Sequence, residues 1–346
     1  MGSNQSNTTK VIGSTSEWVE FEDDWFSQGV SRYAYKGTFH GNARTEGERC
    51  VVKVYKDEYL VHLKDYAWKV DDRVYRKARE MAQLFNARYK PSTATEFVAP
   101  EFTKVDKRAT FYFLGFIPFE RNVKGKIAGT RDNVSNIIPA NASIAVERFL
   151  EGDYVKYSSN TGYVNPDFPA PTLAAFSHFT YHASNGEFLV SDLQGVYNRQ
   201  GFCLTDPAIQ SGGSELNAHG PTDLGKYGIV KFFQTHNCNK LCKGLKKAKI
   251  SKVTPGDKVV LDNVLQNMPS TQSSTTYTYQ LNRKSGLPND AVEHVQNNLT
   301  LDAVAECSET DEPGSDSNSD DQNENKWFKS LGGTIFRLWK LISWSR

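Results

Sequence analysis

Two patterns of hydrophobic and polar residues follow one another along the chain and predict a protein of both strands and helices. Residues 30–39 alternate aromatic and polar side chains, which is the period of a half-buried strand. Between residues 61 and 85 the apolar residues recur every three or four positions, which predicts an amphipathic helix that packs on a sheet. Further strands are predicted over 50–55, 97–105, 110–119 and 144–150, a short helix over 173–181, and loops over 125–142 and 163–171.

Polar segments flank this patterned region. Residues 1–17 are rich in Ser, Thr and Asn, and residues 247–325 are rich in Ser, Thr, Asn and Gln. Such segments bury too little apolar surface to offset the entropy lost on ordering, so we expect both to be disordered. The second ends in an acidic stretch, 306–324, in which several serines adjoin Asp or Glu, and we interpret it as a phosphorylatable linker.

The last segment, residues 326–346, has a different pattern. On a helical projection its Trp, Phe, Leu and Ile residues form one broad arc and its basic residues lie opposite, which favours a helix lying in a membrane interface. The alternatives are a helix that docks on the folded domain or on a partner, or a calmodulin-type target segment. Gly2, with Ser6 after it, fits the pattern for N-myristoylation, and the alternative there is a chance match. Since one acyl chain holds a membrane weakly, the two ends would act together.

Composition narrows the classes of function. Lys plus Arg number 41 and Asp plus Glu number 40, so no net charge draws the chain to nucleic acid. No apolar run reaches the roughly 18 residues of a membrane span, and the N-terminus lacks the charged-then-apolar pattern of a secretory signal. We therefore expect a cytoplasmic location, with membrane contact through the chain ends. In that setting the five cysteines are expected to be reduced and partly bound to metal.

A group of His and Cys residues predicts a metal site. His236-x-Cys238-x-x-x-Cys242 supplies three nitrogen or sulfur donors, which we place on consecutive helical turns. A fourth donor would complete a tetrahedral zinc site, and His178 is our choice, with His182 as the competitor. Four protein ligands leave no open position, so the zinc would be structural. The alternative for each residue is an ordinary core Cys or His, which three donors at this spacing disfavour.

A second set of residues indicates phosphate chemistry. Lys53 lies in a short apolar strand after a glycine-bearing hairpin, an arrangement that covers and then grips the phosphates of a nucleotide, although exposed strand lysines are common. Asp192 and Asp206 end adjacent apolar strands, where they could serve one Mg²⁺ while one of them orients a hydroxyl nucleophile. Gln194 could donate a further oxygen to the metal. The alternative is a pair of turn-forming aspartates, but the glycine loop at 220–225 favours phosphoryl transfer.

The common protein-kinase signatures His-Arg-Asp and Asp-Phe-Gly are absent from the sequence, and so is the Gly-x-x-x-x-Gly-Lys-Ser/Thr phosphate loop. Other motifs take their place: Gly29-x-x-Arg32-x-Ala34-Tyr35-x-Gly37, Val-Val-Lys53, Glu147-Arg-Phe, Gly152, Lys156-Tyr157, His178-Phe-Thr-Tyr, Asp192-Leu-Gln-Gly, Leu-Thr-Asp206-Pro, Gly220-x-x-x-Leu-Gly225-x-x-Gly228 and Phe-Phe-x-x-His236-x-Cys238-Asn-x-x-Cys242. On these motifs, roughly residues 18–246 resemble the α-kinases, a family of atypical serine/threonine protein kinases.

The resemblance implies an α+β, bilobal, atypical protein-kinase-like fold, with a sheet-rich N-terminal lobe over about 18–145 and a zinc-stabilised C-terminal lobe over about 146–246. It implies that Lys53 contacts the ATP phosphates, that Glu147 lies in the hinge and helps to hold the adenine, and that Asp192 is the catalytic aspartate. The other implied sites are Gly29, Arg32, Gly220 and Gly225 for the nucleotide, Gln194 and Asp206 for Mg²⁺, and His178, His236, Cys238 and Cys242 for zinc.

The implied reaction is transfer of the γ-phosphoryl group of Mg·ATP to a Ser or Thr hydroxyl of a protein substrate. One departure concerns the glycine loop, in which the family usually has Asn where this chain has Asp223, and often Gly where it has Thr222. The alternative function is therefore a pseudokinase scaffold, which binds ATP without transfer and recruits partners at a membrane surface. A third, a zinc-binding adaptor unrelated to ATP, would require that Lys53 and both aspartates be coincidental.

Overall fold

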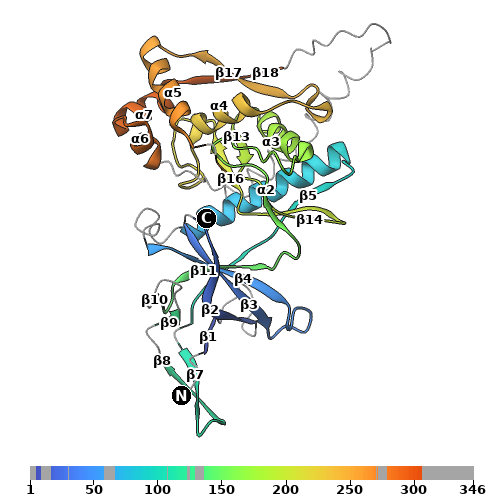
Figure 1. Ribbon diagram of the computed structural model, residues 1–346, viewed down its shortest axis with the longest axis vertical. Coiled ribbons are helices and arrows are strands. Elements are labelled where there is room, and N and C mark those ends of the chain that lie inside the picture. Colours follow the sequence, from blue (N-terminus) through green and yellow to red (C-terminus); the bar gives the residue numbers. More distant parts are fainter. Residues whose placement is uncertain are drawn as a thin grey trace, which may run out of the picture. The chain divides into compact units, whose positions relative to one another are not determined.

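The computed structural model describes residues 5–8, 17–29, 31–57, 67–106, 108–122, 125–128, 136–269, 271 and 279–305. The chain divides into two units, Met1–Glu306 and Cys307–Arg346, and all the described residues lie in the first. They form a mixed α+β fold (Figure 1). The predictions for Gly2, for the acidic stretch at 306–324 and for the helix at 326–346 fall outside the described residues.

An eight-stranded sheet forms the N-terminal lobe, in the order β6-β11-β4-β3-β2-β1-β7-β8 with every pairing antiparallel. Its core includes Val19, Val52 and Ile144. At the start of β2 the buried residues Val19 and Phe21 alternate with more exposed neighbours, whereas successive residues of β4 and β11 are buried on both faces of the sheet. The strands are β1 (Gln5–Thr8), β2 (Trp18–Gln28), β3 (Arg32–His40), β4 (Arg49–Tyr55), β6 (Glu101–Lys104), β7 (Arg108–Phe113), β8 (Ile117–Asn122) and β11 (Ser143–Arg148).

Two predictions for this lobe are wrong. Disorder is predicted over residues 1–17, and this is wrong for residues 5–8, because β1 fills the position between β2 and β7. A strand ladder is made by the backbone, so a polar segment can complete a sheet when neighbours on both sides supply partners. Residues 125–142 were expected to form a loop, yet β9 (Gly125–Ala128) pairs with β10 (Asn136–Pro139) in a two-stranded ribbon that buries Ile138.

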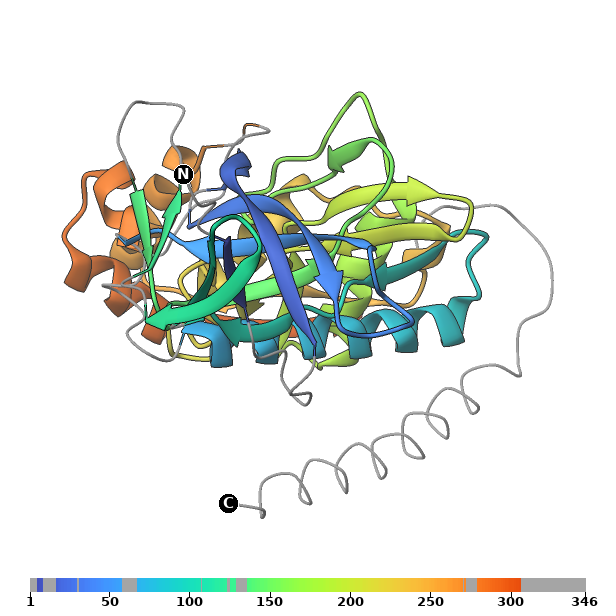
Figure 2. The same ribbon diagram turned by 90° about the horizontal axis from the view of Figure 1, so that it is seen from below.

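The long helix α2 (Ala67–Tyr89) joins the two lobes (Figures 1 and 2). Its first described residue is later than the predicted start, since 61–66 lie outside the described residues, and it continues past the predicted end at 85. On one side Tyr75 packs with Phe102 and Ala145 of the sheet. On another side the helix contributes to the largest core cluster, in the C-terminal lobe, through Val74, Ala78, Met81, Ala82 and Phe85.

The C-terminal lobe is built around two small sheets. One has the order β12-β14-β15-β5, and the other pairs β13 with β16. Helices α3 (Pro171–Ala183) and α4 (Gly225–Thr235) pack on β13 and β16 respectively. The strands are β5 (Ala94–Phe97), β12 (Tyr154–Lys156), β13 (Phe188–Ser191), β14 (Gln194–Asn198), β15 (Gly201–Thr205) and β16 (Ala208–Ser211). No described helix is both long and apolar enough to cross a membrane.

The expectation of disorder over 247–325 is wrong for residues 247–269 and 279–305. They form, with Lys246, β17 (Lys246–Lys252), α5 (Pro255–Asn267), α6 (Tyr279–Ser285), α7 (Asn289–Asn298) and β18 (Thr300–Ala305). The few apolar residues of this segment recur at helical spacing, as Leu261, Val264 and Leu265 do in α5. They are buried against Leu224 and Tyr227, so a sparse apolar stripe is enough to order a mostly polar segment.

Candidate active site and metal centre

The chain passes between the two small sheets of the C-terminal lobe twice, from β13 to β14 and from β15 to β16. An aspartate lies at each of these passages. Ser191 of β13 pairs with Ala208 of β16, while Gln194 of β14 pairs with Thr205 of β15. The intervening residues Asp192 and Asp206 are both in the left-handed region, with φ of 59° and 49°. Non-glycine residues seldom adopt this conformation, and it concentrates at functional sites.

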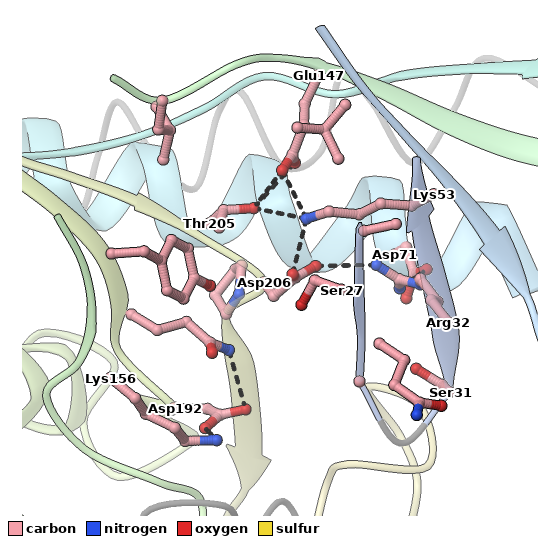
Figure 3. Close-up of a pocket in the computed structure, with 18 of the residues that line it drawn as sticks. Ser27, Ser31, Arg32, Lys53, Asp71, Glu147, Lys156, Asp192, Thr205 and Asp206 are labelled. Carbon is pink, nitrogen blue, oxygen red and sulfur yellow. Dashed lines mark hydrogen bonds and ion pairs between the residues drawn. The ribbon is translucent and has the colours of Figure 1, made fainter. Parts of the chain in front are cut away.

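Both aspartates line a cavity of about 870 Å³. The structure brings most of the predicted nucleotide and magnesium residues to this cavity: Gly29, Arg32, Lys53, Glu147, Asp192, Gln194 and Asp206. Figure 3 shows Lys53 and Asp206 together, with Asp192 elsewhere along the cavity wall. The glycine loop is the exception. Of the described residues in 220–225, only Thr222 lines the cavity, so Gly220 and Gly225 are not placed to touch a nucleotide in it.

The side chain of Lys53 is 7% exposed and is held by three oxygen atoms. Its Nζ lies 2.6 Å from Oε1 of Glu147 and 2.7 Å from Oδ2 of Asp206, and it donates to Oγ1 of Thr205 at 2.9 Å. Burial alone would lower the pKa of Lys53, but Asp206 and Glu147 outweigh it and raise the pKa. Lys53 is therefore a fixed cation in the cavity wall.

The two carboxylates that pair with Lys53 differ in environment. Glu147 is 4% exposed, and burial raises its pKa in spite of Lys53. Its oxygens accept hydrogen bonds from Oγ1 of Thr205 at 3.0 and 2.9 Å. The side chain with the implied adenine role is therefore held by Lys53 and Thr205. The side chain of Asp206 is 32% exposed. Although burial acts to raise its pKa, Lys53 and Arg32 lower that pKa to about 2.

Sequence reasoning missed three members of this network. Asp71 of α2 pairs with Arg32 and accepts a hydrogen bond from Tyr55. Arg32 in turn lies 3.0 Å from Oδ1 of Asp206. Tyr75, also of α2, donates to Asp206 at 2.9 Å. A helix face that combines Asp71 and Tyr75 with apolar residues gives no signal of its own, because the partners are distant in sequence.

A further missed residue is Lys156 of β12. Its Nζ lies 2.7 Å from Oδ1 of Asp192. Asp192 is 3% exposed, so the lysine compensates a carboxylate that is almost removed from water. Gln194 is close to the same aspartate, with Nε2 at 3.5 Å from Oδ2. The sequence motif Lys156-Tyr157 marked this position, but no spacing rule linked it to Asp192.

Asp223 does not face the cavity. It is 0% exposed, and its carboxylate accepts hydrogen bonds from the backbone N–H groups of Ser211 (2.8 Å), Gly225 (2.8 Å) and His219 (3.0 Å). A carboxylate that accepts several backbone N–H groups fixes the conformation of a loop. The negative charge that motivated the pseudokinase alternative is thus directed into the C-terminal lobe.

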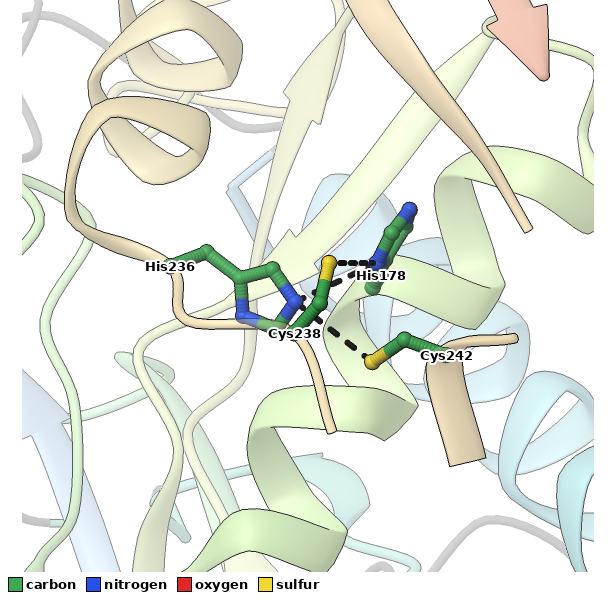
Figure 4. A group of neighbouring side chains, drawn as sticks. All are labelled: His178, His236, Cys238 and Cys242. Atoms are coloured by element: carbon green, nitrogen blue, oxygen red, sulfur yellow. Dashed lines mark hydrogen bonds between the residues drawn. The ribbon is translucent and has the colours of Figure 1, made fainter. Parts of the chain in front are cut away.

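The predicted zinc ligands converge on one point (Figure 4). Nδ1 of His178 lies 3.2 Å from Nε2 of His236 and 3.7 Å from Sγ of Cys238, and Sγ of Cys242 lies 3.5 Å from Nε2 of His236. A tetrahedron with ordinary zinc–nitrogen and zinc–sulfur bonds has edges of about 3.3 to 3.8 Å, so the four donors fit the metal. Nε2 of His178 lies 3.1 Å from the carbonyl of Lys246, which leaves Nδ1 as the metal-binding nitrogen.

Two details of this site correct or extend the prediction. The three later donors are not on consecutive helical turns, because α4 ends at Thr235 and a short 3₁₀ turn, Lys240–Cys242, carries the last one. His182, the competing ligand, accepts a hydrogen bond from the backbone N–H of Lys246 at 3.0 Å and is outside the cluster.

A sequence model of the Alpha-kinase family matches residues 27–242, more than half of the chain. The chain belongs to the alpha-kinase family. Among its relatives, alpha-protein kinase vwkA of Dictyostelium discoideum is 46% identical over 100 residues, and human eukaryotic elongation factor 2 kinase is 35% identical over 151 residues. These matches cover 29% and 43% of this alpha-kinase chain but only 16% and 19% of the relatives, so they concern less than a fifth of each relative's length.

A solved structure agrees with the fold of this alpha-kinase domain. The alpha-kinase domain of myosin-II heavy chain kinase A in complex with adenosine superposes with a TM-score of 0.50 and 22% identity. The match covers 70% of this chain and 92% of that one. The predicted α+β class and alpha-kinase fold are therefore confirmed.

Proposed function

We propose that this chain is a protein serine/threonine kinase that transfers the γ-phosphoryl group of Mg·ATP to a hydroxyl group of a protein substrate. The observation that carries the proposal is the shared cavity of Lys53, Asp192, Gln194 and Asp206. These supply a fixed cation, a base and further oxygen ligands, which are the parts that phosphoryl transfer uses. Family membership and the kinase names of the relatives support it.

Catalysis by these residues is mostly positioning and electrostatic stabilisation. All three N–H groups of Lys53 have oxygen partners, so a phosphate that binds Lys53 must replace one of these partners. We assign that exchange to Asp206, because its side chain is the most exposed of the three. Asp192 then accepts the hydrogen bond of the acceptor hydroxyl and takes its proton as the new O–P bond forms and the bond to ADP breaks. Lys156 holds Asp192 in place for this step.

Two metal ions are part of the proposal. The carboxylate of Asp206 and the amide oxygen of Gln194 are hard oxygen donors on the cavity wall and fit Mg²⁺, which would offset phosphate charge when bound. The His178, His236, Cys238 and Cys242 cluster fits a closed zinc site. Such a zinc would tie α3 to the segment that follows α4 and would have a structural role.

The test is transfer of label from γ-labelled Mg·ATP to a myosin-tail peptide, made in three versions with Ser, Thr or Tyr as the only acceptor. We expect labelling of the Ser and Thr versions and a fall of on the order of a thousandfold in Asp192→Asn, with ATP binding retained. The matched control is Asp153→Asn, an exposed aspartate beside β12. Equal labelling by Asp192→Asn and wild type would refute the assigned base, and labelling of the Tyr version alone would refute the Ser/Thr specificity.

The pseudokinase remains the second candidate. The burial of Asp223 removes the feature that first suggested it. ATP binding by the full chain, without transfer to the peptide versions or to the chain's own serines, would favour it over the kinase.

We also propose that the chain makes peripheral membrane contact through acylated Gly2 and residues 326–346. The sequence patterns support this, and the measurement is co-sedimentation of the full chain with anionic vesicles. Binding that is unchanged by deletion of 326–346 would contradict the part assigned to the tail.

A further inference from the structure

The segment that follows the zinc cluster is attached to α4 through the ends of its helices. Nζ of Lys226 donates to the carbonyls of Gln296 (2.8 Å) and Leu299 (2.7 Å), at the end of α7. Nζ of Lys231 donates to the carbonyl of Leu265 (2.8 Å), near the end of α5. The last carbonyl groups of a helix have no hydrogen-bond donors within the helix and carry partial negative charge. A lysine at that end supplies both the missing donors and a compensating positive charge. Two lysines of α4 thus hold two helices of this segment.

One buried side chain of α7 reaches beyond these contacts. Gln296 is 1% exposed, and both ends of its amide are used. Its Oε1 accepts a hydrogen bond from the backbone N–H of Lys226 (2.9 Å), and its Nε2 donates to the carbonyl of Gly213 (3.0 Å). The amide therefore bridges the two ends of the chain segment 213–226. The contact is close, because a Cβ on Gly225 would come within 2.5 Å of Nε2 of Gln296.

The bridged segment carries the only part of the described glycine loop that lines the cavity. Thr222 is that residue, and its carbonyl accepts hydrogen bonds from Nδ2 of Asn160 (3.0 Å) and Nε2 of Gln210 (3.2 Å). Asp223 fixes the next turn through three backbone N–H groups. The middle of the segment is thus fixed to the C-terminal lobe, and Gln296 fixes its ends.

We infer that Gln296 is a positioning residue for the phosphoryl transfer: its amide closes the segment 213–226 and so sets where Thr222 lies in the cavity. The inference rests on the proposed kinase function. Lys53 and Arg32, which are assigned to the nucleotide, come from the N-terminal lobe, although the metal residue Asp206 comes from the C-terminal lobe. Thr222 shares the C-terminal lobe with Asp192, the base assigned to the acceptor hydroxyl. Gln296 therefore acts on the acceptor polypeptide rather than on ATP.

This assignment also extends the functional domain. The family match ends at residue 242, and Gln296 belongs to a segment that lies after it. Without that segment, Leu224 and Tyr227, both 0% exposed, would lose the cluster that buries them. Residues 246–269 and 279–305 are then part of the catalytic unit, not of a linker.

The decisive variant is Gln296→Met in the full chain, because methionine keeps the length of the side chain and removes both hydrogen bonds. We expect kcat/KM for the acceptor peptide to fall by about 25-fold, since two hydrogen bonds are lost and each corresponds to on the order of a fivefold effect. We expect the dissociation constant for ATP to change by less than about twofold. Amide hydrogen exchange in 213–226 should become faster.

The matched control is Val264→Ala, a buried residue of the same cluster whose side chain makes no hydrogen bond to the segment. It should lower the unfolding temperature and leave kcat/KM unchanged at a temperature where both variants are folded. Gln296→Glu keeps the acceptor for Lys226 and loses the donor to Gly213, so its kcat/KM should be intermediate.

Three results would overturn the inference: an equal loss of kcat/KM in both Gln296→Met and Val264→Ala, an equal weakening of ATP binding and peptide turnover, or unchanged exchange in 213–226. Hydrogen exchange needs no catalysis. If wild type transfers no phosphate, the proposed function fails, and the exchange measurement still decides whether Gln296 closes the segment.

Discussion

Replacing Lys53 should destabilise the folded protein as well as stop transfer. The lysine lies 2.6 Å from Glu147 and 2.7 Å from Asp206, and the Lys53 and Glu147 side chains are 7% and 4% exposed. In Lys53→Met the carboxylate of Glu147 would keep only hydroxyl partners, chiefly Thr205. Breaking a buried ion pair by removing one partner costs about 3–5 kcal/mol. The loss of the contact between Lys53 and Asp206 adds little to this cost, because the Asp206 side chain is 32% exposed and keeps its ion pair with Arg32.

Removing the charge of Glu147 instead of that of Lys53 should lower the free energy of unfolding by less. Glu147→Gln leaves Lys53 paired with Asp206, so we expect a loss of about 1–2 kcal/mol. The double variant Lys53→Met/Glu147→Gln removes both charges together and should cost about 2 kcal/mol rather than the sum of the single changes. The coupling energy between the two residues is then about 3 kcal/mol, well outside the additivity expected of independent sites.

The assay is urea unfolding of the full chain without nucleotide at pH 7. Lys36→Met is the control, an exposed lysine on the adjacent strand β3, and should change the free energy of unfolding by less than about 0.5 kcal/mol. Additive losses for Lys53 and Glu147 would refute the buried pair. Since domains of this kind have about 5–15 kcal/mol of stability, a Lys53 variant shows a catalytic role only if its folded fraction is measured.

Three further predictions follow from the structure. Burial, Arg88 and Lys246 lower the pKa of His182 to about 4, so the unfolded chain binds more protons than the folded chain between pH 6.5 and 4. The free energy of unfolding should therefore decrease by up to about 3 kcal/mol as the pH falls through that window. In a plot of urea midpoint against pH, His182→Gln should flatten this part of the curve. A zinc chelator or Cys238→Ser should lower the unfolding temperature, and retention of stability after complete metal removal would contradict the structural zinc. Asp223→Asn should lower stability by about 1–3 kcal/mol without raising activity, because an amide cannot accept all the backbone bonds of the carboxylate; a gain in activity would restore the view that its charge inhibits.

The parts of the site that the sequence predicts are those whose members lie close together in the chain. His236, Cys238 and Cys242 are near neighbours, and their donor chemistry is recognisable without a structure. The aspartates were recognisable because each ends an apolar strand. What the pattern missed was the conformation between the donors, since the residues after Thr235 leave the helix. The identity of the donor residues was predictable from the sequence, whereas the backbone conformation of the residues between them was not.

Order over residues 246–269 and 279–305 escaped prediction for a different reason. Composition gives only the average polarity of a segment, whereas burial depends on the positions of its apolar residues along the chain. Val292, Val295 and Leu299 are few, but they repeat at helical spacing and meet an apolar face of α4 that would otherwise face water. That face belongs to a distant part of the chain. The polar average of the segment therefore predicted disorder where a partner surface supplies the missing driving force.

The same limit applies to the meaning of a charge. Asp206 and Asp223 are both acidic residues in loops of one lobe, yet Asp206 opens onto the cavity and Asp223 is 0% exposed among backbone N–H groups. The difference arises because Asp206 lies where a strand changes sheets, while Asp223 lies in a segment that Gln296 closes. An acidic residue near a phosphate site is therefore not evidence for or against activity until its partners are known. Here the partners of Asp223 make it a support of the loop, and the reason to suspect a dead enzyme disappears with that assignment.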